Sequence, residues 1–217
     1  MKRLRIVDLG TVEYSSAMEI MHKVREDVKH GNDDTLLILE HNPVITIGTD
    51  DGDDSVVDKT YIKKHSIPIV KTDRGGGAVV HNNGQIVCYP VLRFQGMPVD
   101  LLSEIVSTMY DAVAEFNVKP EKGREPGLWI NGNKVGFVGM KIHEGISMHG
   151  FAINISNNTD LFKTIKTCGI EDERIGNLTR STKSMVSIDR VKNIIVSKFA
   201  KRFGYLPDKF IMQGRDA

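Results

Sequence analysis

The sequence predicts an α+β fold in which a mixed β-sheet is flanked by α-helices. Three segments place their apolar residues on one helical face, and the short apolar runs between them are typical of strands. These helices and strands are interleaved, yet they do not alternate strictly as they do in parallel α/β sheets. We therefore expect a sheet that has both parallel and antiparallel neighbours.

The first expected helix has a signal at each end. Its apolar stripe runs from Ala17 to Val28, and Gly31 follows as a stop. Ser16 and Glu19 have the spacing of a capping box at the start. These signals predict a helix between about Ser16 and Gly31.

The other two expected helices are equally well delimited. The second begins at Asp100, a good N-cap residue, and Pro120 closes it. The third runs from about Ser187 to Phe203, with Gly204 placed to end it. Both carry an apolar stripe, so both are expected to pack on the sheet.

Strands are expected where short apolar runs lie between turn residues. These runs are Leu4–Val7, Thr35–Leu39, Val44–Ile47, Ile67–Val70, Ala78–Val80, Ile86–Leu92 and Ile146–Ile155. A further pair, Leu128–Ile130 and Asn133–Val135, flanks Asn131–Gly132. Asn-Gly between two such runs is the strongest short signal for a β-hairpin.

The composition is that of an ordinary globular protein. The chain has 217 residues, which suits one domain over residues 1–217, with only a weak candidate boundary in the polar run Asn177–Ser184. The net charge of +1 gives no field that would favour nucleic acid or an anionic membrane. The 2 cysteines form neither a disulfide framework nor a zinc spacing, and no apolar stretch is long enough to cross a bilayer. We expect a cytoplasmic protein without a metal site.

The densest chemical signal is the glycine run between Arg74 and His81. Three successive glycines allow close approach of a ligand to the backbone, and the arginine is suited to a phosphate or carboxylate. The run is neither a P-loop nor a dinucleotide-binding fingerprint, because the required lysine and spacing are absent. A plain glycine-rich turn between two strands is about as probable from the residues alone.

Two further residues, Lys134 and Cys168, have the chemistry of a nucleophilic site. Lys134 follows the Asn-Gly turn on a strand, where a lysine more often points to solvent. Pointing inward, it would be suited to proton transfer. A lone cysteine such as Cys168 is more often inert, and its activation needs a nearby base or cation. Lys134 is a candidate for that role, whereas Cys88 lies in an apolar run and is interpreted as core.

For three other polar features we prefer a structural interpretation to a functional one. His149, next to Gly150 on a strand, is more often a satisfied core histidine than a functional one. The acidic run Asp50–Asp54 lacks a full calcium-loop pattern and is interpreted as a solvated loop. The basic residues of the third helix are interpreted as a solvated face, with a docking patch for an acidic carrier protein as the alternative.

In their order and spacing, these signals resemble the lipoyl(octanoyl) transferase family, which is related to the lipoate and biotin protein ligases. The resemblance runs from about Val7 to Ile170. It is carried by Asp8–Gly10 followed by Tyr14, and by Thr35–Gly48, Arg74–His81, Asn133–Val135 with Gly139, His149–Asn154 and Cys168–Ile170. Each piece is short, but the joint match in order is specific.

The resemblance implies a lipoate/biotin-ligase-like catalytic domain with catalytic residues Cys168 and Lys134. Cys168 would take an octanoyl or lipoyl group from acyl carrier protein as a thioester. The acyl group would then pass to a lysine on lipoyl domains of 2-oxoacid dehydrogenases or on the glycine-cleavage H protein. Neither ATP nor a metal would be required, and a monomer is expected. The implied substrate-binding residues are Arg74, Gly75, Gly76, Gly77, Ala78, Val79, Val80, His81, Phe137, Val138, Gly139, Gly150, Phe151 and Ala152.

The chain departs from the family pattern at two places that bear on the acyl group. His81 is followed by Asn82-Asn83-Gly84, where the family usually has Gly-Pro-Gly. Phe137 stands where the family usually has a small residue, so it is a candidate determinant of acyl chain length.

Two alternative functions remain open at this point. An ATP-dependent lipoate–protein ligase would share the fold, the glycine run and the lysine, but it would not need Cys168-Gly169-Ile170. A non-enzymatic binder of carrier domains is disfavoured because Lys134 and Cys168 are both present.

Overall fold

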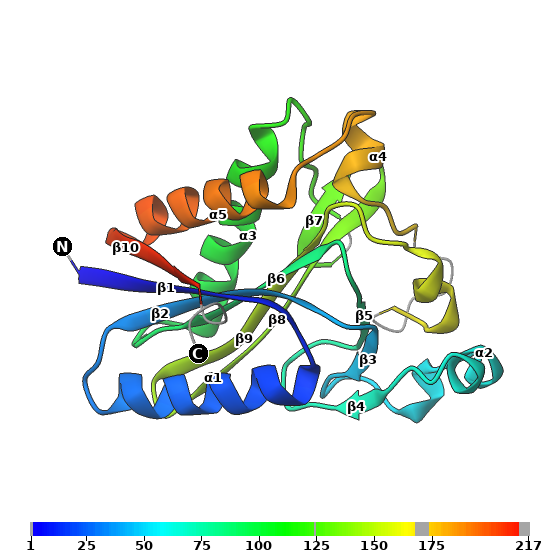
Figure 1. The fold of residues 1–217 in the computed structure, drawn as a ribbon, viewed down its shortest axis with the longest axis horizontal. Helices are drawn as coiled ribbons and strands as arrows, with labels where there is room; N and C mark the ends of the chain where they lie inside the picture. Colours follow the sequence, from blue (N-terminus) through cyan, green and yellow to red (C-terminus); the bar gives the residue numbers. More distant parts are fainter. Residues whose placement is uncertain (1, 124, 168–173, 213–217) are drawn as a thin grey trace.

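The computed structural model describes residues 2–123, 125–167 and 174–212. Figure 1 shows the helices and strands that follow, in chain order. They are β1 (Lys2–Val12), α1 (Tyr14–Lys29), β2 (Asp34–His41), β3 (Val44–Ile47), η1 (Asp53–Ser55), α2 (Lys59–Lys64), β4 (Ile69–Lys71), β5 (Ala78–His81), β6 (Gln85–Val91), α3 (Pro98–Ala114), β7 (Gly127–Ile130), β8 (Asn133–His143), β9 (Ile146–Asn154), η2 (Asp160–Thr164), α4 (Leu178–Thr182), α5 (Ile188–Phe203) and β10 (Tyr205–Met212).

A seven-stranded sheet forms the centre of the molecule, in the order β10-β1-β2-β6-β9-β8-β7 (Figure 1). β1 runs parallel to both β10 and β2, and every later pair in that order is antiparallel. The expected mixed sheet in an α+β fold is therefore confirmed.

Helices cover both faces of this sheet. Successive side chains of a strand point to opposite faces, and in the buried strands both sets are apolar, so each face needs a covering layer. In β2, Leu36 and Ile38 face the core under α3 and α5, whereas Leu37 and Leu39 face α1. Figure 1 shows α3 and α5 on one side of the sheet and α1 on the other. The apolar stripes predicted from the sequence are the faces that these helices bury.

A smaller sheet of three strands, in the order β4-β3-β5, lies beside the large one. β3 is parallel to β4 and antiparallel to β5. Its apolar side chains share a core cluster with residues of α2 and η2 and with Phe137 of β8. This cluster connects the two sheets and so fixes the position of β5 relative to β8.

The start of two helices differs from the prediction. α1 begins at Tyr14 after Glu13, not at the capping box, and Glu13 makes no side-chain cap. α3 begins at Pro98 rather than at Asp100. Proline at the first helical position already has a helical φ and needs no donor there, so it extends the helix by one turn at its start.

The third expected helix and the hairpin were predicted correctly. Ser187 caps α5 by accepting a hydrogen bond from the Arg190 N–H, and Gly204 ends it with a left-handed φ of 69°. Asn131 and Gly132 have φ values of 51° and 69°, as a type I′ turn between β7 and β8 requires.

The short elements α2, α4 and β10 were not predicted. α4 occupies the polar run that had suggested a weak boundary, and Asn177 caps it. β10 pairs with β1, whose sequence position is about 200 residues away. No described helix is both long and apolar enough to span a membrane.

One basic residue of α5, Lys192, does not lie on the solvated face expected for this helix. Lys192 is buried, and its ammonium group lies 2.8 Å and 3.0 Å from the two carboxylate oxygens of Asp8, which ties α5 to β1. Arg190, Lys201 and Arg202 are exposed, as the solvated-face interpretation expected. Lys198 pairs with Glu115, and Arg202 pairs with carboxylates of α3, in ion pairs at the protein surface.

Candidate active site

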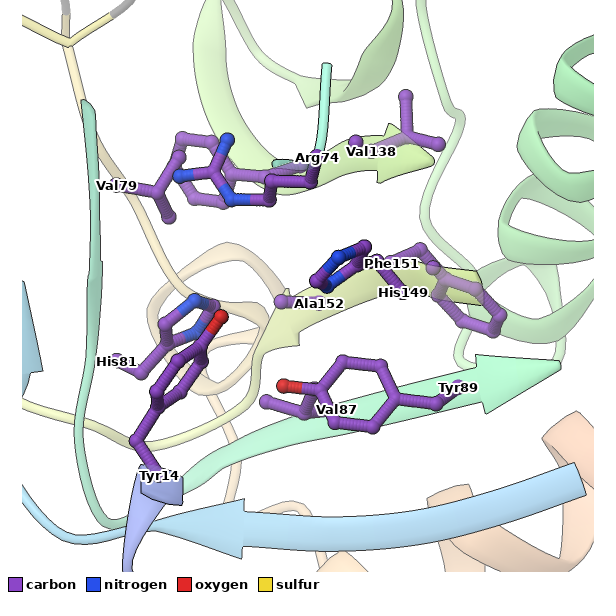
Figure 2. A pocket seen from close by; sticks show the side chains of 13 residues that line it. Tyr14, Arg74, Val79, His81, Val87, Tyr89, Val138, His149, Phe151 and Ala152 are labelled. Atoms are coloured by element: carbon purple, nitrogen blue, oxygen red, sulfur yellow. The ribbon is translucent and has the colours of Figure 1, made fainter. Parts of the chain in front are cut away.

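An enclosed pocket lies where the large and small sheets meet. Its walls come from β5, from the adjacent strands β6, β8 and β9, from the start of α1 and from the loop before β5. The lining residues are Tyr14, Arg74, Val79, His81, Val87, Tyr89, Phe137, Val138, Gly139, His149, Gly150, Phe151 and Ala152. Figure 2 shows the side chains of Tyr14, His81 and His149 around a common space.

One part of this pocket is polar yet uncharged. His81 places Nδ1 at 2.7 Å from Gln85 Oε1, so we assign the proton to Nδ1. Burial and the neighbouring His41 lower the pKa of His81 well below its usual value. Burial raises the pKa of Tyr14 and of Tyr89. These groups are therefore neutral near pH 7 and compatible with an apolar ligand.

His41 supports this part of the pocket from behind. Its Nδ1 lies 3.1 Å from the Val12 carbonyl oxygen, and its Nε2 lies 2.8 Å from the Tyr89 hydroxyl. Burial lowers the pKa of His41 to about 4. A neutral imidazole can donate at Nδ1 and accept at Nε2, so both contacts are satisfied without a charge.

His149 joins the pocket to a surface ion pair. Its Nε2 lies 2.7 Å from Asp73 Oδ1, and Asp73 Oδ2 accepts a bond of 2.7 Å from Lys141. Burial raises the pKa of Asp73, but the bonds from Lys141 and His149 outweigh it and set the pKa at about 2. His149 has a φ of +57°, an uncommon conformation for a residue other than glycine. The interpretation of His149 as a satisfied core histidine is incomplete, because the ring also lines the pocket.

Arg74 is buried and braces the loop before β5. Its guanidinium donates to the Thr46 carbonyl oxygen at 3.0 Å and to the Thr46 hydroxyl at 2.8 Å, which ties the loop to β3. A side chain at Gly48 would place its Cβ only 2.1 Å from the Gly76 carbonyl oxygen. The glycine run therefore serves close backbone packing as well as the pocket.

The acidic run is not simply a solvated loop, which corrects that interpretation. Asp50 accepts a hydrogen bond of 3.1 Å from the Gly76 N–H, and Asp51 accepts one of 2.7 Å from the Ala78 N–H. The Gly75 N–H donates to the Met140 carbonyl oxygen at 3.1 Å. These three donors of the glycine loop are thus engaged by the protein, so they are not poised for a reacting oxyanion.

Lys134 points inward, which decides between the two directions left open by the sequence. Its side chain is 1% exposed, and the ammonium nitrogen lies 3.6 Å from Glu125 Oε2. The same nitrogen is 5.3 Å from the ring centre of Phe137 and 5.5 Å from that of Trp129. Such aromatic faces favour a cation in a site that is otherwise poor in water.

Lys134 also lies at a second, smaller pocket that adjoins the first. Arg74, Val79, Phe137 and Val138 line both pockets. The smaller pocket is completed by Gly76, Gly77, Pro126 and Lys134. Lys134 therefore lines the smaller pocket, whereas Tyr14 lines only the first.

Cys168 lies outside the described residues. The chain on either side of it is held beside the lysine pocket. Thr167 bridges to Ala78 of β5, and Ile175 bridges to Lys134 of β8. In addition, the Lys134 N–H donates to the Arg174 carbonyl oxygen at 2.8 Å, and the Gly176 N–H donates to the Lys134 carbonyl oxygen at 3.0 Å.

The predicted substrate-binding residues are distributed over three environments. The enclosed pocket contains Arg74, Val79, His81, Phe137, Val138, Gly139, Gly150, Phe151 and Ala152. Gly76 and Gly77 line the smaller pocket beside Lys134. Gly75, Ala78 and Val80 line neither, since strand alternation turns Ala78 and Val80 away from the side on which Val79 and His81 lie.

Sequence reasoning did not identify Val87 and Tyr89 as pocket residues. They lie in an apolar strand run, where no local signal distinguishes a pocket residue from a core residue. Cys88, between them, is fully buried in the core, as predicted, and burial strongly raises the pKa of its thiol. Tyr14 was noted only as part of the family resemblance.

A chain of buried amides connects the pocket to the segment beside Lys134. Gln85 accepts from His81 and donates to Asn154 Oδ1 at 2.9 Å, and Asn154 donates to the Gly176 carbonyl oxygen at 2.9 Å. Gln85 and Asn154 are both fully buried. Satisfied networks of this kind fix relative positions, because breaking any bond leaves a buried polar group without a partner.

Among the described residues, no group of three or more histidine, cysteine or acidic side chains could hold a metal ion.

Comparison with known families decides the identity of this fold. The lipoyl protein ligase A/B catalytic domain family matches residues 13–200. The chain belongs to this family. The match spans α1, the small sheet, strands β2 and β6 to β9 of the large sheet, the two pockets and most of α5. The resemblance inferred from the sequence motifs is thereby confirmed.

Curated relatives of this family are similar over nearly the whole chain. A protein named octanoyltransferase from Clostridium kluyveri is 35% identical, over 84% of this chain and 81% of its own length. One with the same name from Nitratidesulfovibrio vulgaris is 33% identical, over 92% of this chain and 94% of its own length. The expectation that the chain is an enzyme, an acyltransferase, is confirmed.

Solved structures confirm the predicted fold. A bi-partite lipoate protein ligase from Thermoplasma acidophilum, described in a structural analysis of the ligase and its E2 lipoyl domain, has a TM-score of 0.79 at 19% identity, covering 98% of this chain and 89% of its own. A biotin protein ligase from Aquifex aeolicus has a TM-score of 0.55 at 13% identity, covering 94% and 71%. At such identities the likeness concerns the fold alone.

Proposed function

We propose that this protein transfers an octanoyl group, or its lipoyl equivalent, from acyl carrier protein to a lysine of a lipoyl domain. The observation that carries the proposal is the position of Lys134, a buried amine where the apolar pocket adjoins the strand pairs that flank Cys168. The names of the curated relatives support octanoyl as the acyl group.

In the first step, the Cys168 sulfur attacks the thioester carbonyl of the acyl carrier. A new carbon–sulfur bond forms, the bond to the carrier sulfur breaks, and the leaving sulfur receives the proton that Cys168 gave up. Both the donor and the acyl-enzyme are thioesters, so the exchange is close to thermoneutral and needs neither ATP nor a metal. A cation near the cysteine favours its thiolate, and Lys134, which bridges to the chain after Cys168, is the proposed cation.

In the second step, the ε-amine of the acceptor lysine attacks the acyl-enzyme. An amide bond forms, the bond to Cys168 breaks, and the proton lost by the amine passes to the departing sulfur. Lys134 is the proposed carrier of that proton, since a buried lysine can both accept and donate at one nitrogen. The walls formed by Val79, Val87 and Ala152 suit an alkyl chain, because each buried methylene contributes about 0.8 kcal/mol.

The acceptors proposed are lipoyl domains of 2-oxoacid dehydrogenases or the glycine-cleavage H protein. The structural relative from Thermoplasma acidophilum is a lipoate protein ligase described together with its E2 lipoyl domain, which supports this class of acceptor. The cytoplasm is the proposed location, because a reducing compartment keeps a nucleophilic thiol free. A monomer is proposed as the working form.

The decisive experiment weighs the intact protein after incubation with octanoyl-acyl carrier protein in the absence of ATP. We expect an octanoyl adduct that hydroxylamine removes, as it does thioesters. Cys168→Ala should lack the adduct, whereas Cys88→Ala, the matched control at a core thiol, should form it. Absence of any adduct, together with labelling of a lipoyl domain by octanoate and ATP, would replace the transferase by a ligase.

A further inference from the structure

Two side chains, Tyr14 and His149, stand between the acyl pocket and the protein surface, and we call them the wall. Both line the acyl pocket. The same two residues line a groove of about 750 Å³ that is open to solvent. The groove runs between the start of α1 and the end of β4, and its lining does not include Lys134. Neither wall residue lines the smaller pocket beside Lys134.

The wall is held shut by two contacts to the same short segment after β4. The Tyr14 hydroxyl donates to Thr72 Oγ1 at 3.2 Å, and His149 Nε2 lies 2.7 Å from Asp73 Oδ1. Thr72 and Asp73 themselves line the groove. The side chains of α1 and β9 are thus both tied to one piece of backbone, so the two rings stay in place together.

The backbone of His149 indicates that its position is enforced. Its φ of +57° lies in the left-handed region, which disfavours residues that carry a side chain. The ring is nevertheless 3% exposed and packed edge-on to Tyr89, with ring centres 6.4 Å apart. An unfavourable backbone conformation persists only where the surroundings fix it, and such positions concentrate at ligand sites.

We propose that Tyr14 and His149 set the maximum length of the acyl chain by closing the end of the pocket opposite Lys134. The inference rests on the proposed function, which places the reacting carbonyl at the Lys134 end. An acyl chain would then run from Lys134 toward Tyr14, past Val79, Val87 and Ala152. Its terminal methyl meets the two rings, and removal of either ring opens the pocket toward the surface groove.

Both rings can face an alkyl group because they carry no charge. Burial lowers the pKa of His149, against the opposing effect of Asp73, and burial raises the pKa of Tyr14. Arg74 and His22 are the other charged or titratable neighbours that act on His149, and both also oppose its protonation. A neutral imidazole and a phenol present ring faces that an alkyl chain can contact without removing an ion from water.

Phe137 is not the terminal wall in this arrangement, although the sequence suggested it as the determinant of chain length. Its ring stacks on Phe162 with centres 5.2 Å apart, and the Lys134 nitrogen lies 5.3 Å from its centre. It therefore flanks the reacting end of the chain. A substitution there changes the shape near the carbonyl rather than the depth available to the tail.

The test compares kcat/KM for acyl carrier proteins loaded with C8, C10 and C12 chains, using one lipoyl domain as acceptor. His149→Gly opens the wall and suits the positive φ, and Tyr14→Ala opens it from the α1 side. We expect the C12-to-C8 ratio to rise about tenfold or more in either variant, since each added methylene that becomes buried favours binding about fourfold. Tyr14→Phe keeps the ring and loses only the bond to Thr72, so its ratio should rise much less than that of Tyr14→Ala.

Each outcome decides the question. Wild-type transfer of C8 with an unchanged C12-to-C8 ratio in both His149→Gly and Tyr14→Ala would overturn the wall, while leaving the proposed function intact. A rise in the C12-to-C8 ratio in Phe137→Ala alone would mean that Phe137, beside Lys134, limits the chain length, and it would overturn the role of Tyr14 and His149. Lack of any acyl transfer by the wild-type protein would remove both proposals. Thermal unfolding confirms that each variant is folded before its ratio is used.

Discussion

Two buried lysines of this protein have opposite surroundings. Lys192 of α5 lies in the packed layer between helix and sheet, with its ammonium bonded to both oxygens of Asp8 at 2.8 Å and 3.0 Å. Lys134 of β8 lies at a pocket, 3.6 Å from a glutamate that is 34% exposed, and between two aromatic rings. The first arrangement fixes a charge in a structural pair, whereas the second presents an amine to a space that a substrate can enter.

The difference teaches that burial of a lysine does not by itself identify a catalytic group. Both side chains are almost fully buried, so burial does not separate them. What separates them is the pocket, which adjoins Lys134 and not Lys192. If a lysine serves only folding, replacing it and its acidic partner together by apolar residues should leave both stability and activity largely intact. If a lysine takes part in the reaction, its replacement should abolish activity even when the protein stays folded.

The largest expected effect is on catalysis, at Lys134. Lys134→Met should lower kcat/KM for octanoyl transfer by about 10²–10⁴-fold, the usual contribution of a positioned acid–base group. Its free energy of unfolding should change by about 1 kcal/mol or less, because methionine fills a similar volume without an ammonium to bury. Steady-state kinetics and urea unfolding measure the two quantities.

Lys134→Arg sharpens that prediction by separating the two proposed roles. Arginine keeps a positive charge but does not lose its proton in proteins, so it can favour the thiolate and cannot carry a proton. Adduct formation in single turnover should survive better than transfer to the lipoyl domain. Equal loss of both steps would argue against proton transfer by Lys134.

The second effect is on stability, at Lys192. Lys192→Met should destabilise the fold by about 3–5 kcal/mol, because the Asp8 carboxylate stays buried without its partner. Adding Asp8→Asn should restore much of that loss, since the amide oxygen can keep the bond of 2.9 Å from the Gly10 N–H. Urea unfolding of the two single variants and the double variant checks this. Loss of catalysis by folded Lys192→Met would break the contrast between the two lysines.

The third effect concerns pH: acid should lower the free energy of unfolding, because the histidines at and behind the pocket are buried in their neutral form. The pKa of His41 in the folded protein is lowered to about 4, so the unfolded chain binds the proton more readily between about pH 6.5 and pH 4. Stability should be full above that window and should fall through it by about 3 kcal/mol from His41. Burial lowers the pKa of His81 and of His149 as well, which adds in the same direction.

Urea unfolding at pH 7.5 and pH 4.5 measures this acid effect. His41→Gln serves as the control. Its free energy of unfolding should be lower than that of the wild-type protein at pH 7.5, and it should fall less between pH 7.5 and pH 4.5. Equal unfolding free energies of the wild-type protein at both pH values would contradict a set of buried, neutral histidines.

The smallest effect is expected at Glu125. Its carboxylate is partly exposed and 3.6 Å from Lys134, and such pairs contribute about 0–1 kcal/mol. Glu125→Gln should therefore lower kcat/KM by about tenfold or less. A loss as large as that of Lys134→Met would mean that Lys134 depends on this acid, and that the two buried lysines differ less than their surroundings indicate.

Much of the fold could be predicted because its signals are local. The apolar stripes of α1, α3 and α5 and the Asn131–Gly132 turn are periodic or turn patterns that are read within one segment. The short helix α4 and the strand β10 were missed because no comparable pattern marks them, and β10 exists through its pairing with β1. Strand partners are chosen by tertiary packing, which local patterns do not specify.

The candidate site shows the same division. The glycine run, Lys134 and the strand with His149 were identified from the sequence, largely through their joint family resemblance. The contacts that give them meaning link distant residues, such as Tyr14 with Thr72, which are 58 positions apart, and His149 with Asp73, which are 76 apart. No spacing rule connects such pairs, so the wall of the pocket could not be predicted.

By itself, the sequence determined the fold class, the main helices and the motifs of the family, because periodicity, turn chemistry and motif order are properties of a linear chain. Only the tertiary structure decided that Lys134 points inward while Lys192 is held by Asp8, and that Tyr14 and His149 close one pocket. The physical reason is that the direction of a side chain and its burial depend on which segments pack against it. Those neighbours are brought together only when the sheets and helices assemble.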